Sequence, residues 1–128
     1  MSDQNIRLEG AGAVEALFGY WPSFHDAEIL RIELDRKGPR VAIDVLTDVK
    51  PGSGRYIIVR FVFHGIDDLS LEDFNHQNVI WSLELELAPE NRMRITFHSI
   101  FGAALSFTCA RGEVIEAAPS DLRTGHPR

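Results

Sequence analysis

Residues 21–28 read WPSFHDAE, and the change of pattern across this stretch decides the fold. Before it, Val14, Leu17 and Phe18 show the i, i+3, i+4 spacing of one helical stripe. After it, apolar residues recur at every second position, which is the period of a strand with one solvated face. The stretch therefore lies where a short helix, expected over residues 10–19, gives way to a sheet.

Strand patterns follow in six segments: 28–35, 41–45, 56–64, 79–87, 93–101 and 105–109. Most links are too short for a parallel crossover, so neighbouring strands are expected to be antiparallel. Residues 65–78 interrupt the pattern. There Ser70 is predicted to cap a helical turn over residues 71–74, and the polar run 75–78 is typical of a solvated loop. We predict an α+β fold, mainly antiparallel β: a short N-terminal helix followed by a bent six-stranded sheet or sandwich.

Alternation also predicts which side chains face the core. In the hairpin formed by residues 79–87 and 93–101, strict alternation places Trp81 on the apolar face. Glu84 and Glu86 then lie on the opposite face. Arg92 and Arg94 reach that face from the partner strand, so cross-strand ion pairs are expected, each worth about 0.2–1 kcal/mol.

Length and composition indicate one soluble domain. The chain has 128 residues, of which 45% are hydrophobic and 25% charged. We place the domain at residues 1–117 and a flexible C-terminal tail at 118–128, because the tail holds few apolar groups. The lone Cys109 excludes an intrachain disulfide, and its position between apolar neighbours predicts a buried, inert thiol.

Charge and hydropathy exclude several partners. The formal net charge is -6 and no basic stripe stands out, so nucleic-acid binding is not expected. The longest apolar stretch, residues 56–63, contains Arg60 and is too short to cross a membrane. No secretory signal precedes it, so a cytoplasmic location is expected.

Candidate catalytic and metal-binding residues are sparse. The five histidines lack metal-ligand spacing, so neither a metal nor a cofactor is expected, although His64 and His98 could approach each other across the sheet. On an extended segment His25 and Asp26 would point to opposite faces. Ser23 belongs to no nucleophile motif of the Gly-x-Ser-x-Gly type. We therefore predict that the protein is not an enzyme.

The octapeptide itself admits two roles. A structural role, in building the end of the sheet, is expected of Pro22, Phe24 and Asp26. A partner-binding role is expected of three others, since tryptophan and charged neighbours are typical interface anchors: Trp21, His25 and Glu28.

At this point the sequence resembles a known family. WPSFHDAE, running into an alternating strand, is similar to the opening of immunity protein 50, a family of small bacterial proteins. Residues 77–81 (QNVIW) and 99–107 (SIFGAALSF) fit the same pattern, and the resemblance spans residues 17–109. It implies a cytoplasmic protein that binds and neutralises a cognate bacterial toxin. It carries no catalytic residues over to this chain.

Three hypotheses for function follow. The first is a non-enzymatic binding protein, with a cognate toxin as its protein partner. The second is a small enzyme or ligand-binding protein that uses a cluster of His25, Asp26 and Glu28, which predicts a pocket where these side chains converge. The third is a homodimeric structural module that covers an apolar sheet face with a second copy.

Overall fold

One helix and eight strands make up the fold in a computed structural model, which describes residues 6–48 and 55–121. The helix α1 (Ala11–Phe18) comes first, and a short 3-10 turn, η2 (Pro89–Asn91), joins the fifth and sixth strands. The strands are β1 (Glu28–Asp35), β2 (Arg40–Leu46), β3 (Ile57–His64), β4 (Asp67–Glu72), β5 (Val79–Ala88), β6 (Arg92–Phe101), β7 (Ala104–Cys109) and β8 (Arg111–Pro119).

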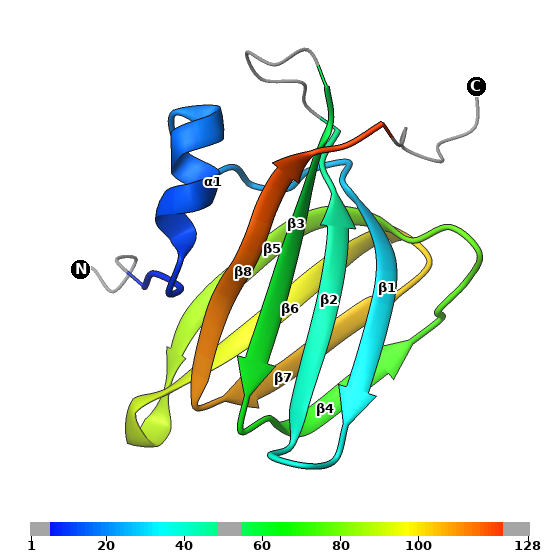
Figure 1. The fold of residues 1–128 in the computed structure, drawn as a ribbon. Coiled ribbons are helices and arrows are strands. Elements are labelled where there is room, and N and C mark those ends of the chain that lie inside the picture. Colours follow the sequence, from blue (N-terminus) through cyan, green and yellow to red (C-terminus); the bar gives the residue numbers. More distant parts are fainter. Residues whose placement is uncertain (1–5, 49–54, 122–128) are drawn as a thin grey trace.

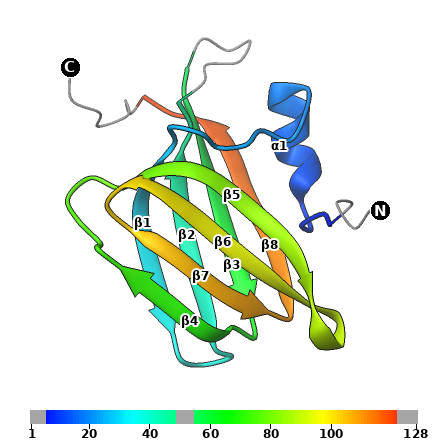
Figure 2. The ribbon, with the colours of Figure 1, turned by 180° about the vertical axis from the view of Figure 1, so that it is seen from behind.

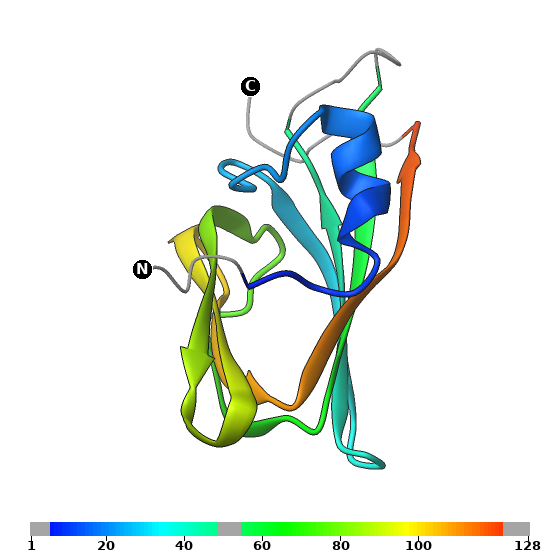
Figure 3. The ribbon, with the colours of Figure 1, turned by 90° about the vertical axis from the view of Figure 1, so that its left-hand side faces the viewer.

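The strands form one open antiparallel sheet in the order β4-β7-β6-β5-β1-β2-β3-β8. The sheet folds over between β5 and β1, so that β8, β3, β2 and β1 form one layer and β5, β6, β7 and β4 form the other (Figure 1). Figure 3 shows the two layers edge-on, with α1 beside β8 at the open side. The prediction of an α+β fold is confirmed, but the predicted count of six strands is wrong because β4 and β8 also pair.

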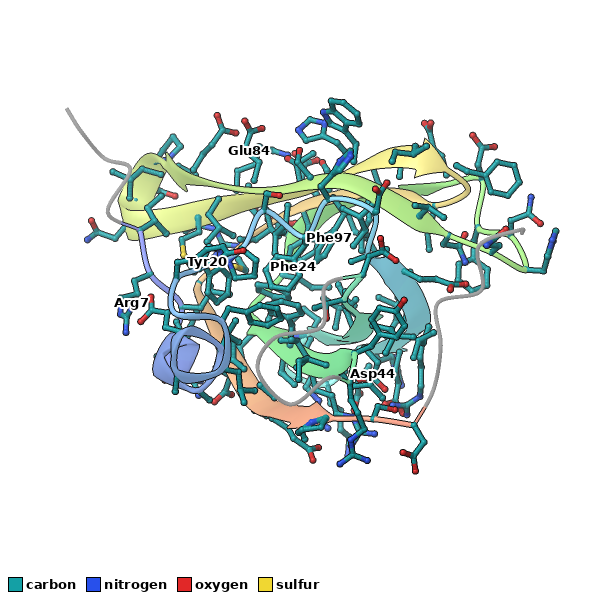
Figure 4. The ribbon with its side chains drawn as sticks, turned by 90° about the horizontal axis from the view of Figure 1, so that it is seen from above. Arg7, Tyr20, Phe24, Asp44, Glu84 and Phe97 are labelled. Atoms are coloured by element: carbon teal, nitrogen blue, oxygen red, sulfur yellow. The ribbon has the colours of Figure 1, made fainter. Side chains whose placement is uncertain are left out.

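The core lies between the two layers and is built on phenylalanines. Phe61 is fully buried, and its ring makes contacts with four other aromatic rings at centroid distances of 5.6–6.4 Å. Phe97 reaches this space from β6 and Phe24 from the segment before β1 (Figure 4). Alternation in β3 had predicted its core face, which is fully buried: Ile57, Val59, Phe61 and Phe63.

The helix follows the sequence pattern closely. Val14 is fully buried, and Leu17 and Phe18 pack against the core. Gly19 ends the helix at φ 84°, and its N–H donates to the carbonyl of Glu15. Eight residues are too few for a stable isolated helix, so α1 depends on docking against the sheet. Among the described residues no helix is long and apolar enough to span a membrane.

The predicted helical turn at residues 71–74 is wrong. Residues 67–72 form β4, an edge strand in which Ser70 and Leu71 pair with Ser106 and Leu105 of β7. Pairing with a neighbouring strand satisfies more backbone groups than one isolated turn does, so tertiary context overrides a weak capping signal. At the other end of the sheet, β8 extends to Pro119, two residues into the predicted tail. Residues 122–128 of that tail lie outside the described part of the chain.

The prediction that Trp81 faces the core is wrong. The register of β5 against β6 shifts across this residue: Ile80 pairs with Ser99 and Ser82 pairs with the next residue, His98, so Trp81 has no counterpart in β6. Trp81 is the extra residue of a β-bulge. A bulge interrupts the alternation of side chains between the two faces of a strand, so the side chain of Trp81 can face solvent. Its side chain is 58% exposed, whereas Ile80 is 1% exposed.

In the β5–β6 hairpin, Arg92 and Arg94 bind groups other than the expected Glu84 and Glu86. The shared face is as predicted, since Glu86 lies opposite Arg94. However, Arg94 donates to Asp68 of β4, and Arg92 donates to the carbonyl oxygen of Gly65. Asp68 belongs to β4 and Gly65 to the link before it. The sequence pattern did not reveal that β4 pairs with β7 in the same sheet, two strands from β6.

The polar run 75–78 was predicted to be solvated, but its second half is buried. Asn78 is 3% exposed, and its Oδ1 accepts hydrogen bonds from the backbone N–H groups of Asn75 and Ala103 at 2.9 Å. Its Nδ2 donates to the carbonyl of Asn75. Asn78 therefore fastens the loop after β4 to the turn between β6 and β7, where Gly102 adopts φ 81°.

Replacing Gly102 by alanine is expected to lower the free energy of unfolding by more than the cost of placing an alanine in a left-handed backbone conformation. A Cβ atom there would lie 2.5 Å from both Asn78 Oδ1 and the carbonyl oxygen of Gln77. Gly19 is the matched control, because it has a similar φ of 84° and no neighbouring atom within 4 Å. Gly19→Ala should cost about 1–2 kcal/mol in a urea denaturation curve. An equal cost for Gly102→Ala would show that the close packing contributes nothing.

The prediction of a buried Cys109 thiol is confirmed. The side chain is fully buried in β7, and burial raises the pKa of the thiol to about 11. Because the thiolate is the nucleophilic form, a thiol that stays protonated at neutral pH is poorly reactive. Cys109 thus serves as a small apolar core residue.

Candidate functional site

The octapeptide forms the seam that joins the two layers. The N–H of Asp26 donates to the carbonyl of Ile80, and the N–H of Ile80 donates to the carbonyl of Ala27, both at 2.8 Å. The N–H of Leu83 donates to the carbonyl of Ser23. Residues 23–27 therefore run beside β5 before β1 begins, and they hold β5 against the β1 layer.

Left-handed backbone gives this segment its shape. Phe24 and Asp26 both have positive φ angles, of 64° and 66°, and Asp26 has a short polar side chain that tolerates this conformation. Ser23 supports the turn, because its Oγ accepts a hydrogen bond from the N–H of His25. As a result Phe24 points into the core and His25 points to solvent.

The three residues predicted for a structural role lie in or beside the core. Pro22 is buried, and Phe24 is 3% exposed and packs edge-on against Phe61 at 5.6 Å. Asp26 is half-buried and contributes its N–H to the seam.

Trp21, predicted to bind a partner, is half-buried and packs edge-on against Phe24 and Phe61.

His25 lies against Trp81 on the outside of the molecule. The ring centroids are 4.7 Å apart with an interplanar angle of 86°, which is an edge-to-face contact. His25 Nδ1 lies 3.0 Å from the carbonyl oxygen of Trp81 and must be the donor, since a carbonyl only accepts. Nε2 lies 3.5 Å from Asp26 Oδ2.

The expectation that His25 and Asp26 point to opposite faces is wrong. It assumed an extended segment, whereas the two residues occupy a turn with Asp26 in the left-handed region. The turn brings both side chains to one side, and β5 adds Trp81 beside them. Glu28 is separated from this group: it is 7% exposed and lies in β1 between Leu46 and Val79.

Two further side chains extend this group along the outer face of β5 and β6. His98 pairs across the strands with Ser82, and its Nε2 lies 3.0 Å from Glu84 Oε1. Glu84 points away from the core (Figure 4). Figure 2 shows the layer that carries this face, with β5, β6, β7 and β4 toward the viewer. We call the following residues the Trp81 surface: His25, Asp26, Trp81, Glu84 and His98.

A second group of charges lies on the other layer. Asp44 is 8% exposed and lies 3.5 Å from Arg31 and 3.6 Å from Arg60. Arg31 and Arg60 also pair with Glu33 and Glu116, at 2.7 and 2.9 Å. Every charge here has an opposite neighbour, so the network ties β1, β2, β3 and β8 together rather than presenting an unmatched charge to a ligand.

The described residues offer no candidate metal centre. They contain no group of three or more His, Cys, Asp or Glu side chains that could hold a metal ion. His64 and His98 do not approach each other, since His64 pairs with Glu113 in one layer and His98 with Glu84 in the other.

The hypothesis of a ligand-binding protein predicts a pocket where His25, Asp26 and Glu28 converge. The described part of the surface carries four cavities of 270–560 Å³. None of the four is lined by His25, Asp26 or Glu28. Trp21 does line one of them, a 270 Å³ cavity between α1 and β5, where Arg7 and Glu15 form an ion pair. That hydrogen bond to Arg7 holds the pKa of the Glu15 carboxyl below its ordinary value.

Sequence reasoning identified His25 and missed Trp81. No residue pattern marks the β-bulge that exposes the indole, since residues 79–87 alternate regularly as a sequence. The family pattern QNVIW did include Trp81, but a strand tryptophan fits a core position equally well. The bulge becomes visible only when β6 is in register beside β5.

Comparison with known proteins places the chain in a family. The sequence pattern of immunity protein 50 matches residues 10–119, which spans the helix and all eight strands. No curated protein and no solved structure matches the chain. The match covers most of the sequence, and it includes the octapeptide, the seam and the Trp81 surface. The chain therefore belongs to the immunity protein 50 family.

Proposed function

We propose that this protein is a non-enzymatic cytoplasmic immunity protein that binds and neutralises a cognate bacterial toxin. Membership of the immunity protein 50 family favours a protein partner. The single observation that carries the proposal further is the exposed Trp81, which is held in place by His25 and is not needed to fill the core.

The Trp81 surface has the physical properties of an interface anchor. Tryptophan contributes a large apolar area with few rotatable bonds, and it is enriched among residues that dominate binding energy. The edge-to-face contact with His25 and the bulge in β5 fix the indole before a partner arrives. A fixed side chain loses less conformational entropy on binding than a mobile one.

The partner residues predicted from the sequence then divide into two groups. We propose that His25 contacts the toxin directly, together with Trp81. Trp21 and Glu28 lie beneath, in the core and in the seam, where they hold the segment that carries His25. Asp26 and Glu84 add carboxylates at the rim, which favours a toxin surface that is basic at this point.

Co-expression with the polypeptide toxin encoded beside this gene tests the proposal. Cells that produce the toxin alone should stop growing, and cells that also produce this protein should grow. A Trp81→Ala/His25→Ala variant, produced at the same level, should protect poorly. Growth arrest that is unchanged by the wild-type protein would contradict the proposal.

A further inference from the structure

A groove lies next to the Trp81 surface, over β4, β7 and the end of β6. Two cavities of 270 and 560 Å³ share Ser99 and Ala104 in their linings and are therefore adjacent. The smaller cavity has a floor of short side chains, so the main chain of a partner can approach closely: Ser70, Thr96, Ser99, Ala104 and Ser106.

Large apolar side chains line the other end of the groove. Phe74 is 56% exposed, Ile100 is 48% exposed and Phe101 is 47% exposed, and all three line the 560 Å³ cavity. Solvent-exposed apolar residues that gather in one hollow are typical of a protein-binding site, whereas single ones are ordinary.

The apolar end of the groove is held rigid from below. Asn78 binds Asn75, which follows Phe74, and it also binds Ala103, which follows the turn after Phe101. One buried side chain thus fixes both walls of the cavity relative to each other. A preformed hollow of this kind binds with a smaller ordering cost than one that must form on contact.

The charges along the groove are acidic. Glu72 and Asp73 line it, and neither lysine nor arginine is among its lining residues. His98, the one basic side chain there, lies 3.0 Å from Glu84. A partner segment with lysine or arginine beside an apolar residue would be complementary to both features.

The groove adjoins the Trp81 surface through β6. Trp81 bulges from β5 between residues that pair with Ser99 and His98, and both of these line the groove. A partner that covers the indole would therefore reach the groove without a gap between the two contacts.

We infer that this groove binds a toxin segment that carries a large apolar side chain next to lysine or arginine. The apolar side chain enters between Phe74, Ile100 and Phe101, and the basic side chain pairs with Glu72 or Asp73. A second copy of this chain is a poorer occupant, because it carries the same net charge of -6. The inference rests on the proposed function and specifies where and how the toxin is recognised.

Calorimetric titration with the toxin, inactivated by mutation, tests the groove. Phe74→Ala and Glu72→Lys should each raise Kd by about tenfold or more, as expected for central contacts. Phe74 lies in a loop and Glu72 is exposed, so both variants should keep the wild-type melting temperature. Leu87→Ala is the matched control: Leu87 is 62% exposed near the other end of β5 and should leave Kd unchanged.

Each outcome separates the groove from the proposed function. Tight binding by the wild type and unchanged binding by Phe74→Ala and Glu72→Lys would overturn the groove alone. No binding by the wild-type protein would overturn both proposals. A dimer of this protein that Phe74→Ala dissociates, with toxin binding unaffected, would show that the groove is an interface between copies and would also overturn the inference.

Discussion

Phe61→Ala is expected to lower the free energy of unfolding by about 3–5 kcal/mol, a large part of the stability of a domain of this size. The ring is fully buried and packs against Trp21 and Phe24 of the octapeptide, Phe63 of the same strand and Phe97 of the facing layer. Truncation would leave a cavity between all of these elements. Urea denaturation followed by tryptophan fluorescence and by circular dichroism measures the loss.

Two controls make this result specific. Phe61→Leu keeps much of the volume and should cost about 1.5 kcal/mol or less. Tyr20→Ala removes an aromatic ring that is 57% exposed, and it should change stability by about 0.5 kcal/mol or less. A loss for Phe61→Ala no greater than that of Tyr20→Ala would show that the two layers do not pack as described.

Trp81→Ala is expected to weaken toxin binding by about 2 kcal/mol or more, which corresponds to about 30-fold in Kd. The indole is exposed, so its removal should leave the free energy of unfolding nearly unchanged. Surface plasmon resonance should show the effect mainly as faster dissociation, because short-range contacts act on the dissociation rate.

His25→Ala tests whether the indole must be held in place. It removes the edge-to-face contact and the hydrogen bond to the carbonyl of Trp81, and it leaves Trp81 itself. Its effect on Kd should be smaller than that of Trp81→Ala.

The Kd of Trp81→Ala is compared with that of Leu87→Ala as the control. A Kd for Trp81→Ala equal to that of the wild type would show that Trp81 is not part of the interface.

Much of the fold follows from local pattern. The 3.6-residue period before the octapeptide and the two-residue period after it predict α1 and six strands at nearly their observed positions. β4 was not predicted in this way, because all six of its residues are exposed and its alternation is limited to Leu69 and Leu71. Such an edge strand exists because β7 offers it a partner, and pairing across the sheet is not a property of the local sequence.

The functional site was less predictable than the fold, for a related reason. His25 was found because tryptophan and charged neighbours in one short stretch are typical interface anchors. Trp81 was assigned to the core because period-two alternation assumes a regular strand, and a bulge changes the face of one residue without changing the pattern. Glu28 lies in the seam between layers, a position that exists only once β5 reaches β1.

The octapeptide links stability to recognition. Phe24 and Trp21 join the aromatic core, the backbone of Asp26 and Ala27 joins β5, and His25 supports Trp81 on the outer face. Alternating burial in one short segment therefore allows the residues that build the seam to position the residue that we expect to bind the toxin.

The measurement that tests this account most directly is calorimetric titration of the purified wild-type protein with the inactivated toxin encoded beside its gene. We predict a saturable complex of defined stoichiometry that forms with the wild-type protein and with Leu87→Ala, and that Trp81→Ala weakens by about 30-fold. Absence of heat and of a co-migrating complex with the folded wild-type protein would contradict the central claim that this chain is a toxin-binding immunity protein.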